Sequence, residues 1–280
     1  MTLNNTPLKT RFAPSPTGYL HLGHVLSAYT AWAWAKANNA QFILRIEDID
    51  TTRCKDIYTD AIMRDLEWLG LDWQGEVIKQ SERFELYKGA ITTLQNKGLV
   101  YPCFTTRKEI SNHPHTIGGD GIIYPGIWRN ASQQQIDAQM AVNTPYCQRL
   151  KTDSAYSACQ THSFIDSAQG TIIVDASICG DVVICRKDVP TSYHISVCLD
   201  DNAQGITHII RGKDLFEQTH IHRILQGNLG YSAPLYTHHD LITDDRGKKF
   251  SKSDKSLTIK DLRECGHSPE DVLRMVGVYT

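Results

Sequence analysis

The stretch RFAPSPTGYLHLGH, residues 11–24, decides how the N-terminal part of this chain folds. It begins inside a short strand expected at KTRFA (9–13) and leads into a helix (25–35) indicated by apolar side chains at helical spacing. A second strand, QFILRIED (41–48), follows. Strand, glycine-containing loop, helix and strand in this order predict a βαβ unit, and therefore a parallel sheet with a right-handed crossover.

The remaining pattern predicts an α/β protein with an inserted α+β subdomain and a short helical C-terminal segment. Apolar spacing indicates helices at 62–69, 84–94 and 214–227, whereas YHISVCLDD (193–201) and GITHIIRG (205–212) are typical of strands. A polar stretch with short β-branched runs such as TIIVD and DVVIC separates them. The predicted ranges are 1–104 for the first half of the core, 105–185 for the insert, 186–240 for the second half and 241–280 for a basic loop with helices.

Composition limits the class of protein and the compartment that we expect. A chain of 280 residues with 41% hydrophobic content can bury a large core, and it shows neither a signal peptide nor the ~20 apolar residues of a membrane span. Eight cysteines without CxxC pairs indicate reduced thiols, so we expect a cytoplasmic protein without membrane contact. The net charge of −2 gives no global argument for nucleic acid. Residues 246–263 are nevertheless locally basic, with seven Lys/Arg against two Asp.

The two histidines of the opening stretch suggest an anion site. Ligands of open α/β sheets bind beyond the carboxyl ends of the strands, where helix N-termini carry partial positive charge. His21 and His24 lie three residues apart, so at the first turn of a helix both would project to one side and could donate from Nε2 to a phosphate. The alternative is a Pro/Gly loop with a histidine that merely caps the helix.

A second motif, KFSKS (249–253), places two lysines three residues apart with hydroxyls between them. Taken alone, this pattern is typical of a solvated run of charges. Lysine is also a compact cation suited to phosphate, and a loop of this kind can close over a bound polyphosphate.

Together, HLGH and KFSKS resemble the HIGH and KMSKS signatures of class I aminoacyl-tRNA synthetases, and RIEDID and IIRGKDL resemble the glutamyl branch of that family. The resemblance implies a Rossmann-like core that uses ATP and Mg²⁺ to convert L-glutamate into glutamyl-adenylate. The glutamyl group would then move to an RNA hydroxyl.

The resemblance also implies site residues. For catalysis it indicates His21, His24 and Lys252. For glutamate binding it indicates Arg11, Ala13, Ser15, Glu47, Tyr193 and Arg211. For ATP binding it indicates Pro14, Gly18, His21, Gly23, His24, Lys249, Ser251 and Lys252. The alternatives are surface arginines beside strands, a solvated strand end at Glu47 and a core tyrosine.

Glutamyl-tRNA synthetases carry a large helical domain that reads the anticodon, and we expect no such domain in this sequence, which runs only about thirty residues past KFSKS, to Thr280. It resembles instead the short paralogues that attach glutamate to queuosine at the wobble position of tRNA(Asp). Its expected partner is therefore the anticodon loop of tRNA(Asp), and we expect a monomer. Two alternatives stay open: a synthetase that charges the acceptor end, and a non-catalytic module that binds an amino acid or RNA.

The family also has a zinc site built on a C-x-C pair and a Y-x-x-x-C stretch. The matching residues here read CFT (103–105) and YPGIW (124–128), so only Cys103 and Tyr124 correspond to ligands. Two ligands are too few for a closed tetrahedral site, and Zn²⁺ is not expected. His113 and His115 are the substitutes that the sequence offers.

Overall fold

The predicted βαβ unit is confirmed in the computed structural model, which describes residues 7–119, 121–242 and 257–278. β1 (Lys9–Phe12) leads through the Pro/Gly loop into α1 (Leu22–Ala37), and β2 (Gln41–Ile46) returns beside β1. The two strands are parallel, with Arg11 opposite Ile43. β3 (Ile78–Lys79) extends the sheet beside β2.

A second sheet continues the core on the other side of β1. Its order is β11 (His208–Gly212), β12 (Leu235–His239), β8 (Ser163–Asp166) and β9 (Gly170–Ile173), and only β9 is antiparallel. The two sheets adjoin where the Thr207 amide donates to the Lys9 carbonyl at 3.0 Å and the Lys9 amide donates to Thr207 Oγ1 at 2.8 Å. Residues at the carboxyl ends of β1 and β11 line one pocket, so the two strands end on the same side, as the predicted α/β class requires.

The segment YHISVCLDD was wrongly predicted as a strand. It forms α7 (Tyr193–Ala203), in which every side chain from His194 to Asp201 is buried. A helix that is covered on all sides shows no polar face. A short stretch with β-branched residues such as Ile195 and Val197 therefore cannot be told from a buried strand by the periodicity of its apolar residues.

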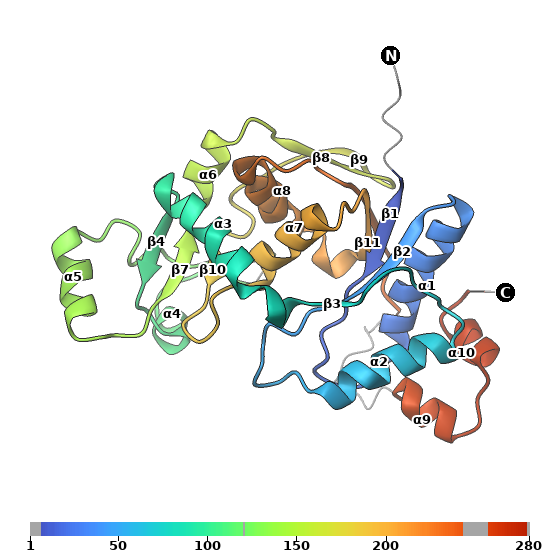
Figure 1. The fold of residues 1–280 in the computed structure, drawn as a ribbon. Helices are drawn as coiled ribbons and strands as arrows, with labels where there is room; N and C mark the ends of the chain where they lie inside the picture. Colours follow the sequence, from blue (N-terminus) through green and yellow to red (C-terminus); the bar gives the residue numbers. More distant parts are fainter. Residues whose placement is uncertain (1–6, 120, 243–256, 279–280) are drawn as a thin grey trace, which may run out of the picture.

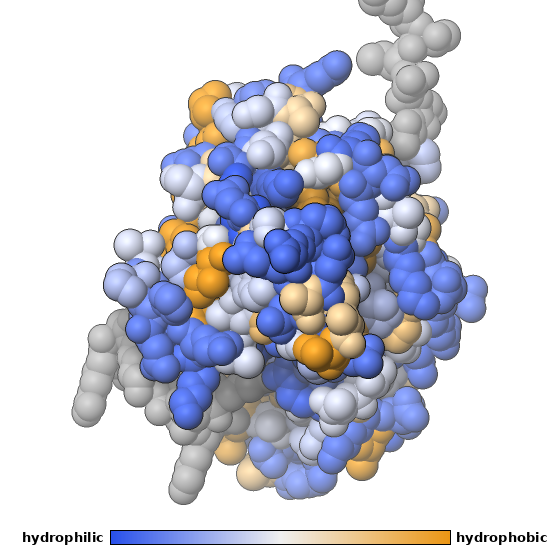
Figure 2. All heavy atoms as spheres, turned by 90° about the vertical axis from the view of Figure 1, so that its left-hand side faces the viewer, coloured by the Kyte–Doolittle hydropathy of each residue, from blue (hydrophilic) through white to orange (hydrophobic). Residues whose placement is uncertain are grey.

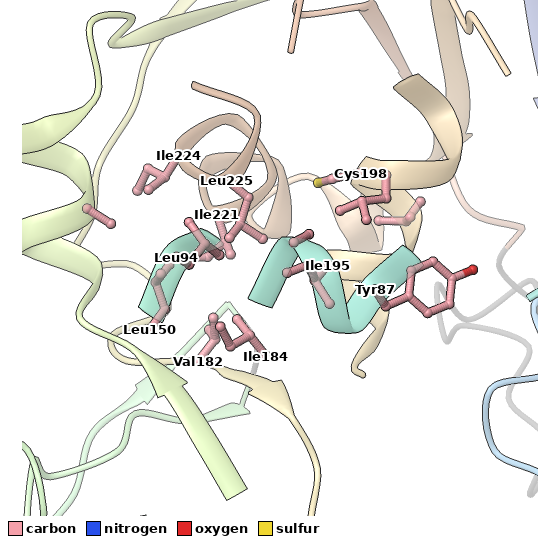
Figure 3. Packing of buried hydrophobic residues seen from close by; sticks show 14 of the residues in the cluster. Tyr87, Leu94, Leu150, Val182, Ile184, Ile195, Cys198, Ile221, Ile224 and Leu225 are labelled. Atoms are coloured by element: carbon pink, nitrogen blue, oxygen red, sulfur yellow. The ribbon is translucent and has the colours of Figure 1, made fainter. Parts of the chain in front are cut away.

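The core surrounds α3 (Phe84–Asn96), which packs with α7 and α8 (Gln218–Leu229). Figure 3 shows Leu94 of α3 beside Ile221 of α8 and Leu150 of the small sheet, with Tyr87 further along the same helix. A single 3-10 turn (Lys213–Leu215) precedes α8, so the helix predicted from residue 214 starts at Gln218. Buried side chains of these helices share one apolar cluster with Ile209 of β11 and Tyr236 of β12.

The inserted region contains a small antiparallel sheet of β4 (Val100–Cys103), β7 (Cys147–Leu150) and β10 (Val183–Cys185). Around it lie the hairpin β5 (Ile117–Gly118) and β6 (Gly121–Ile122), and the helices α4 (Arg107–Asn112), α5 (Gln133–Ala141) and α6 (Thr152–Ala158). Figure 2 views this end of the molecule, whose surface is mainly hydrophilic with apolar residues in small separate groups. The four predicted domain ranges stay a prediction. The sheet elements do not follow the predicted limits of the insert, because β4 lies before residue 105 and β8, within 105–185, pairs with β12 of the core.

The helices α2 (Asp56–Trp68), α9 (Ile259–Glu264) and α10 (Pro269–Met275) lie near α1 at the opposite end (Figure 1). Each contributes buried apolar side chains, such as Ile62, Leu262 and Val272, to the cluster that contains Val25 and Ala28 of α1. In the part of the chain that the structure describes, no helix is long and apolar enough to cross a membrane.

Candidate functional site

A pocket of about 610 Å³ opens at the carboxyl ends of β1, β2 and β11. It brings together residues that the sequence had predicted from both halves of the chain: Arg11, Ala13, Pro14, Ser15, His21, Gly23, His24, Glu47, Tyr193 and Arg211. Because these residues reach the pocket from β1, α1, β2, α7 and β11, the fold assembles the site from segments far apart in the sequence.

The start of α1 forms one wall of the pocket. His21 is the N-cap, and its Nδ1 accepts a hydrogen bond from the Gly23 amide at 3.1 Å. His24 Nδ1 accepts from the His21 amide at 3.2 Å, and the two ring centroids lie 3.8 Å apart. A neutral imidazole that accepts at Nδ1 carries its proton on Nε2, so both rings are donors at their outer nitrogen. His21 and His24 thus use Nδ1 to cap the helix, and Nε2 of each neutral ring stays a donor.

Gly23 has a steric role in this arrangement. A Cβ at position 23 would lie 3.1 Å from Cε1 and 3.2 Å from Nδ1 of the His21 ring. A larger residue would therefore push the cap away from the helix. Gly18 meets no atom within 4 Å at the corresponding Cβ position and does not line the pocket.

Arg11 is held by a buried carboxylate from α7. Its Nε donates to Asp201 Oδ1 at 3.0 Å, and the Arg45 guanidinium reaches the same oxygen at 2.9 Å. Arg45 is fully buried and also donates to Glu47 Oε1 at 3.2 Å. This network fixes the positions of Arg11 and Glu47 relative to each other.

The charge state of Glu47 is set by competing effects. Burial raises the pKa of the Glu47 carboxyl, and the Arg45 and Arg11 guanidinium groups oppose that rise. A cation arriving in the pocket would favour the ionised form further. Asp201 shows the opposite balance: its pKa is lowered despite burial, because Arg11 and Arg45 stabilise its ionised form.

Arg211 lies on β11, lines the same pocket as Arg11 and is 5% exposed. It donates to the Tyr193 hydroxyl at 3.4 Å, and burial raises the pKa of that hydroxyl to about 12. Tyr193 is the first residue of α7, so the helix misread as a strand supplies both this hydroxyl and the carboxylate that holds Arg11.

Three predicted residues, Lys249, Ser251 and Lys252, lie outside the described residues. The chain on either side of that segment reaches the site. Leu241 and Ile242 line the pocket, and Thr258 forms a β-bridge with His21. The Ile259 amide also donates to the Leu20 carbonyl at 2.8 Å.

Sequence reasoning missed several lining residues and the residues behind them. Ser27 follows His24 by three positions on the same face of α1, a spacing that could have revealed it, and its Oγ lies 2.9 Å from His239 Nε2. The other missed lining residues include Gly212, Asp214, Leu215, Gln218, Leu241 and Ile242. Adjacent acids in an apolar run, as in VCLDD, were the available signal for Asp201.

The two residues that match zinc ligands lie in a separate small cluster. Cys103 and Tyr124 are buried together, and Cys103 stands opposite Cys147 on the neighbouring strand. A hydrogen bond with Cys147 lowers the pKa of the Cys103 thiol. The Tyr124 hydroxyl accepts from the Trp128 amide at 2.8 Å, and the Arg149 guanidinium lies 4.0 Å from its ring centroid.

This arrangement does not fit a tetrahedral zinc site. The phenol oxygen is engaged by an amide, a cation covers the ring, and no third matching ligand is present among these residues. Across the described ranges, no group of three or more His, Cys, Asp or Glu side chains is placed to hold a metal ion.

Residues 7–279 match the family model described as "tRNA synthetases class I (E and Q), catalytic domain". A glutamyl-Q tRNA(Asp) synthetase of Rhodobacter capsulatus is 42% identical over 279 residues, which cover 96% of this chain and 99% of that protein. A glutamate–tRNA ligase of Aquifex aeolicus is 36% identical over 94% of this chain but only 55% of its own length.

Among solved structures, a glutamate-tRNA synthetase from Elizabethkingia anophelis superposes with a TM-score of 0.79 at 28% identity. The match covers 97% of this chain and 61% of that one. This chain thus corresponds to a little over half of the longer ligases, and to nearly all of the Rhodobacter protein.

Proposed function

The chain belongs to the class I (E and Q) tRNA synthetase family and, within it, to the glutamyl-Q tRNA(Asp) synthetases, and from this premise we propose that it activates L-glutamate with ATP and transfers the glutamyl group to queuosine in tRNA(Asp). The observation that carries the proposal is the joint placement of Arg11, Glu47 and Arg211 in one pocket beside the start of α1.

The charges of this pocket complement glutamate. Glutamate brings two carboxylates and one ammonium group, and the pocket offers the guanidinium groups of Arg11 and Arg211 and the carboxylates of Glu47 and Asp214. A guanidinium group has only donors, so it favours a carboxylate over the amide of glutamine. We assign Arg11 and Arg211 to the substrate carboxylates and Glu47 to the ammonium group, with Tyr193, Ala13 and Ser15 lining the same space.

Activation needs no nucleophile from the protein. The α-carboxylate oxygen of glutamate attacks the α-phosphorus of ATP, the bond to the bridging oxygen breaks, and pyrophosphate leaves with that electron pair. The protein positions both reactants and stabilises the charge that builds on the phosphates. We assign this task to the Nε2 donors of His21 and His24 at the helix start. Pro14 and Gly18 of the preceding loop, Gly23 in the first turn of α1, and Lys249, Ser251 and Lys252 on the pyrophosphate side complete the proposed ATP site.

Transfer completes the reaction. A hydroxyl of the queuosine cyclopentene ring attacks the acyl carbon of the adenylate, AMP leaves, and the hydroxyl proton passes to solvent or to the departing phosphate. A single-stranded anticodon loop can present a splayed base to such a pocket. We propose that Mg²⁺ enters as part of the ATP complex, bound through phosphate oxygens and water.

We further propose a cytoplasmic monomer. No disulfide joins any cysteine in the described residues, as expected for a reducing compartment. Sedimentation of the purified chain with and without tRNA tests the oligomeric state.

The deciding experiment uses radiolabelled glutamate, ATP and tRNA(Asp) isolated from cells that make or lack queuosine. We expect glutamate-dependent ATP–pyrophosphate exchange without RNA, followed by transfer only to the queuosine-containing tRNA. Nuclease digestion should place the label in the anticodon loop. Equal transfer to both tRNA preparations would contradict the proposal.

The 36% identity to the Aquifex ligase favours one alternative, charging of the acceptor end of tRNA(Glu). That activity would leave the label on the terminal ribose, and prior periodate oxidation of the tRNA would abolish it. A non-catalytic module would show no exchange with any amino acid.

A further inference from the structure

The guanidinium group of Arg211 is surrounded by neutral acceptors. Its hydrogen-bond acceptors are His238 Nε2 at 3.1 Å, Tyr193 OH at 3.4 Å, His222 Nδ1 at 3.4 Å, Thr219 Oγ1 at 2.7 Å and the Leu215 carbonyl at 3.2 Å. No carboxylate of the described ranges forms an ion pair with Arg211, in contrast to Arg11, which pairs with Asp201. A buried charge is costly unless it is paired. The charge of Arg211 is thus available to a ligand.

His238 lies between Arg211 and the carboxylate of Asp166. The imidazole Nδ1 lies 2.8 Å from Asp166 Oδ2, and both side chains are fully buried. The other oxygen of Asp166 accepts from the amides of Ala168 and Gln169, which fixes the carboxylate in its turn. The Asp166 carboxylate can only accept, so Nδ1 of His238 must be the donor and carries the proton of the neutral ring. The lone pair of Nε2 then faces Arg211.

The surroundings of His238 keep it neutral. Burial and the Arg211 charge lower its pKa to about 4, although Asp166 acts in the opposite direction. The groups that face it from packed elements are Arg211 of β11, Asp166 of β8, Phe216 and Thr219 around the start of α8, and Tyr236 and His239 of its own strand. A protonated imidazole here would place a second cation against Arg211.

His222 repeats this arrangement from α8. Its Nδ1 accepts from Arg211, so a neutral ring donates from Nε2 to His194 Nδ1 at 3.3 Å. Burial and the Arg211 charge lower the pKa of His222 well below its usual value. Two imidazoles thus satisfy guanidinium N–H groups without cancelling the positive charge.

We propose that Asp166, His238 and His222 are positioning residues that orient Arg211 while leaving its full charge for a carboxylate of the substrate. This inference rests on the proposed function for the identity of that substrate. A direct ion pair between Arg211 and Asp166 would compete with the ligand. His238, which lies between them, fixes the orientation of the guanidinium group and leaves its positive charge unpaired. Donors preorganised in this way bind an anion without further rearrangement.

The substitution Asp166→Asn tests the proton position. The amide oxygen can keep the turn hydrogen bonds, so its NH₂ group would face His238 Nδ1 and force the proton onto Nε2. The Nε2–H of His238 would then face the Nε–H of Arg211, and neither group could accept a hydrogen bond from the other. We expect the KM for glutamate in ATP–pyrophosphate exchange to rise about 10- to 100-fold, with the KM for ATP changed less than about twofold.

Asp175→Asn is the matched control, because Asp175 holds a turn through Ser177 and lies outside the pocket. It should leave both KM values unchanged. An unchanged glutamate KM in a folded Asp166→Asn variant would overturn the proposal.

A second measurement needs no variant. Nitrogen-15 NMR of the imidazoles in the wild-type chain should show His238 neutral and protonated on Nδ1 between about pH 6 and 8. A proton on Nε2, or a charged ring, would overturn the proposal even if Asp166→Asn does not fold. Failure of the proposed function is distinguishable, since the wild type would then lack glutamate-dependent exchange whatever the tautomer of His238.

Discussion

The Nε of Arg11 lies 3.0 Å from Oδ1 of Asp201, which ties the end of β1 to the interior of α7. The same oxygen accepts from Arg45, so one carboxylate holds two buried guanidinium groups. Removing one member of a buried ion network leaves uncompensated charge, which is far more costly than loss of a surface pair. The position of Arg11, which we propose binds the substrate, therefore depends on a side chain that does not line the pocket.

Asp201→Asn should destabilise the protein by about 3–5 kcal/mol, because Arg11 and Arg45 would lose their shared counter-charge. Urea unfolding followed by fluorescence measures the change. Asp72→Asn is the control: Asp72 forms an exposed pair with Lys36, and its loss should cost less than about 1 kcal/mol. Equal effects of the two substitutions would show that the buried network contributes no more than a surface pair.

Arg211→Lys should weaken glutamate binding while the fold survives. Lysine keeps the charge but cannot form the several hydrogen bonds that orient the guanidinium fork. We expect the KM for glutamate to rise about 10- to 100-fold, measured by ATP–pyrophosphate exchange, with little change in the KM for ATP. Arg274→Lys on the exposed face of α10 supplies the control. A KM rise shared equally by both substrates would point to general distortion.

Glutamate binding should weaken as the pH falls. Burial raises the pKa of Glu47, so the ionised form needed for the substrate ammonium is present above that pKa and lost below it. The KM for glutamate should therefore increase from about pH 8 toward pH 5.5, a range in which the substrate carboxylates remain ionised. Glu47→Gln should raise the KM and remove this dependence. A variant that keeps the wild-type pH profile would exclude Glu47 as its source.

The sequence predicted the parts of this molecule that depend on local pattern. Strand, loop and helix around residues 9–46 follow from apolar spacing, and the predicted residues of the loop converge as the parallel topology requires. α7 was misread because a fully buried helix has no polar face to reveal its period. A strand assignment would alternate His194 and Ile195 between faces, whereas the helix buries both.

The residues behind the pocket could not be predicted for a different reason. Asp201, Arg45 and His238 act through contacts between elements distant in the sequence. The adjacent acids of VCLDD were the one local signal for Asp201, and the neighbourhoods of Arg45 and His238 carry none. Resemblance to the family indicated Arg11, Glu47, Tyr193 and Arg211, which line the pocket. Only the packing shows that Arg11 has an acid partner and that Arg211 is held by imidazoles.

The two roles of His21 can be separated by substitution. As N-cap, His21 accepts from the Gly23 amide, and as a proposed phosphate donor it uses Nε2. Asparagine is a good N-cap but cannot replace the imidazole donor, so His21→Asn should keep the melting temperature while lowering the rate of exchange about 10-fold or more. His21→Ala should lose the cap as well, at a cost of about 1 kcal/mol in stability. Thermal unfolding and ATP–pyrophosphate exchange on both variants measure the two effects. Should Asn at position 21 leave exchange intact while Ala impairs it, the histidine would act as a cap alone, and the phosphate role would pass to His24.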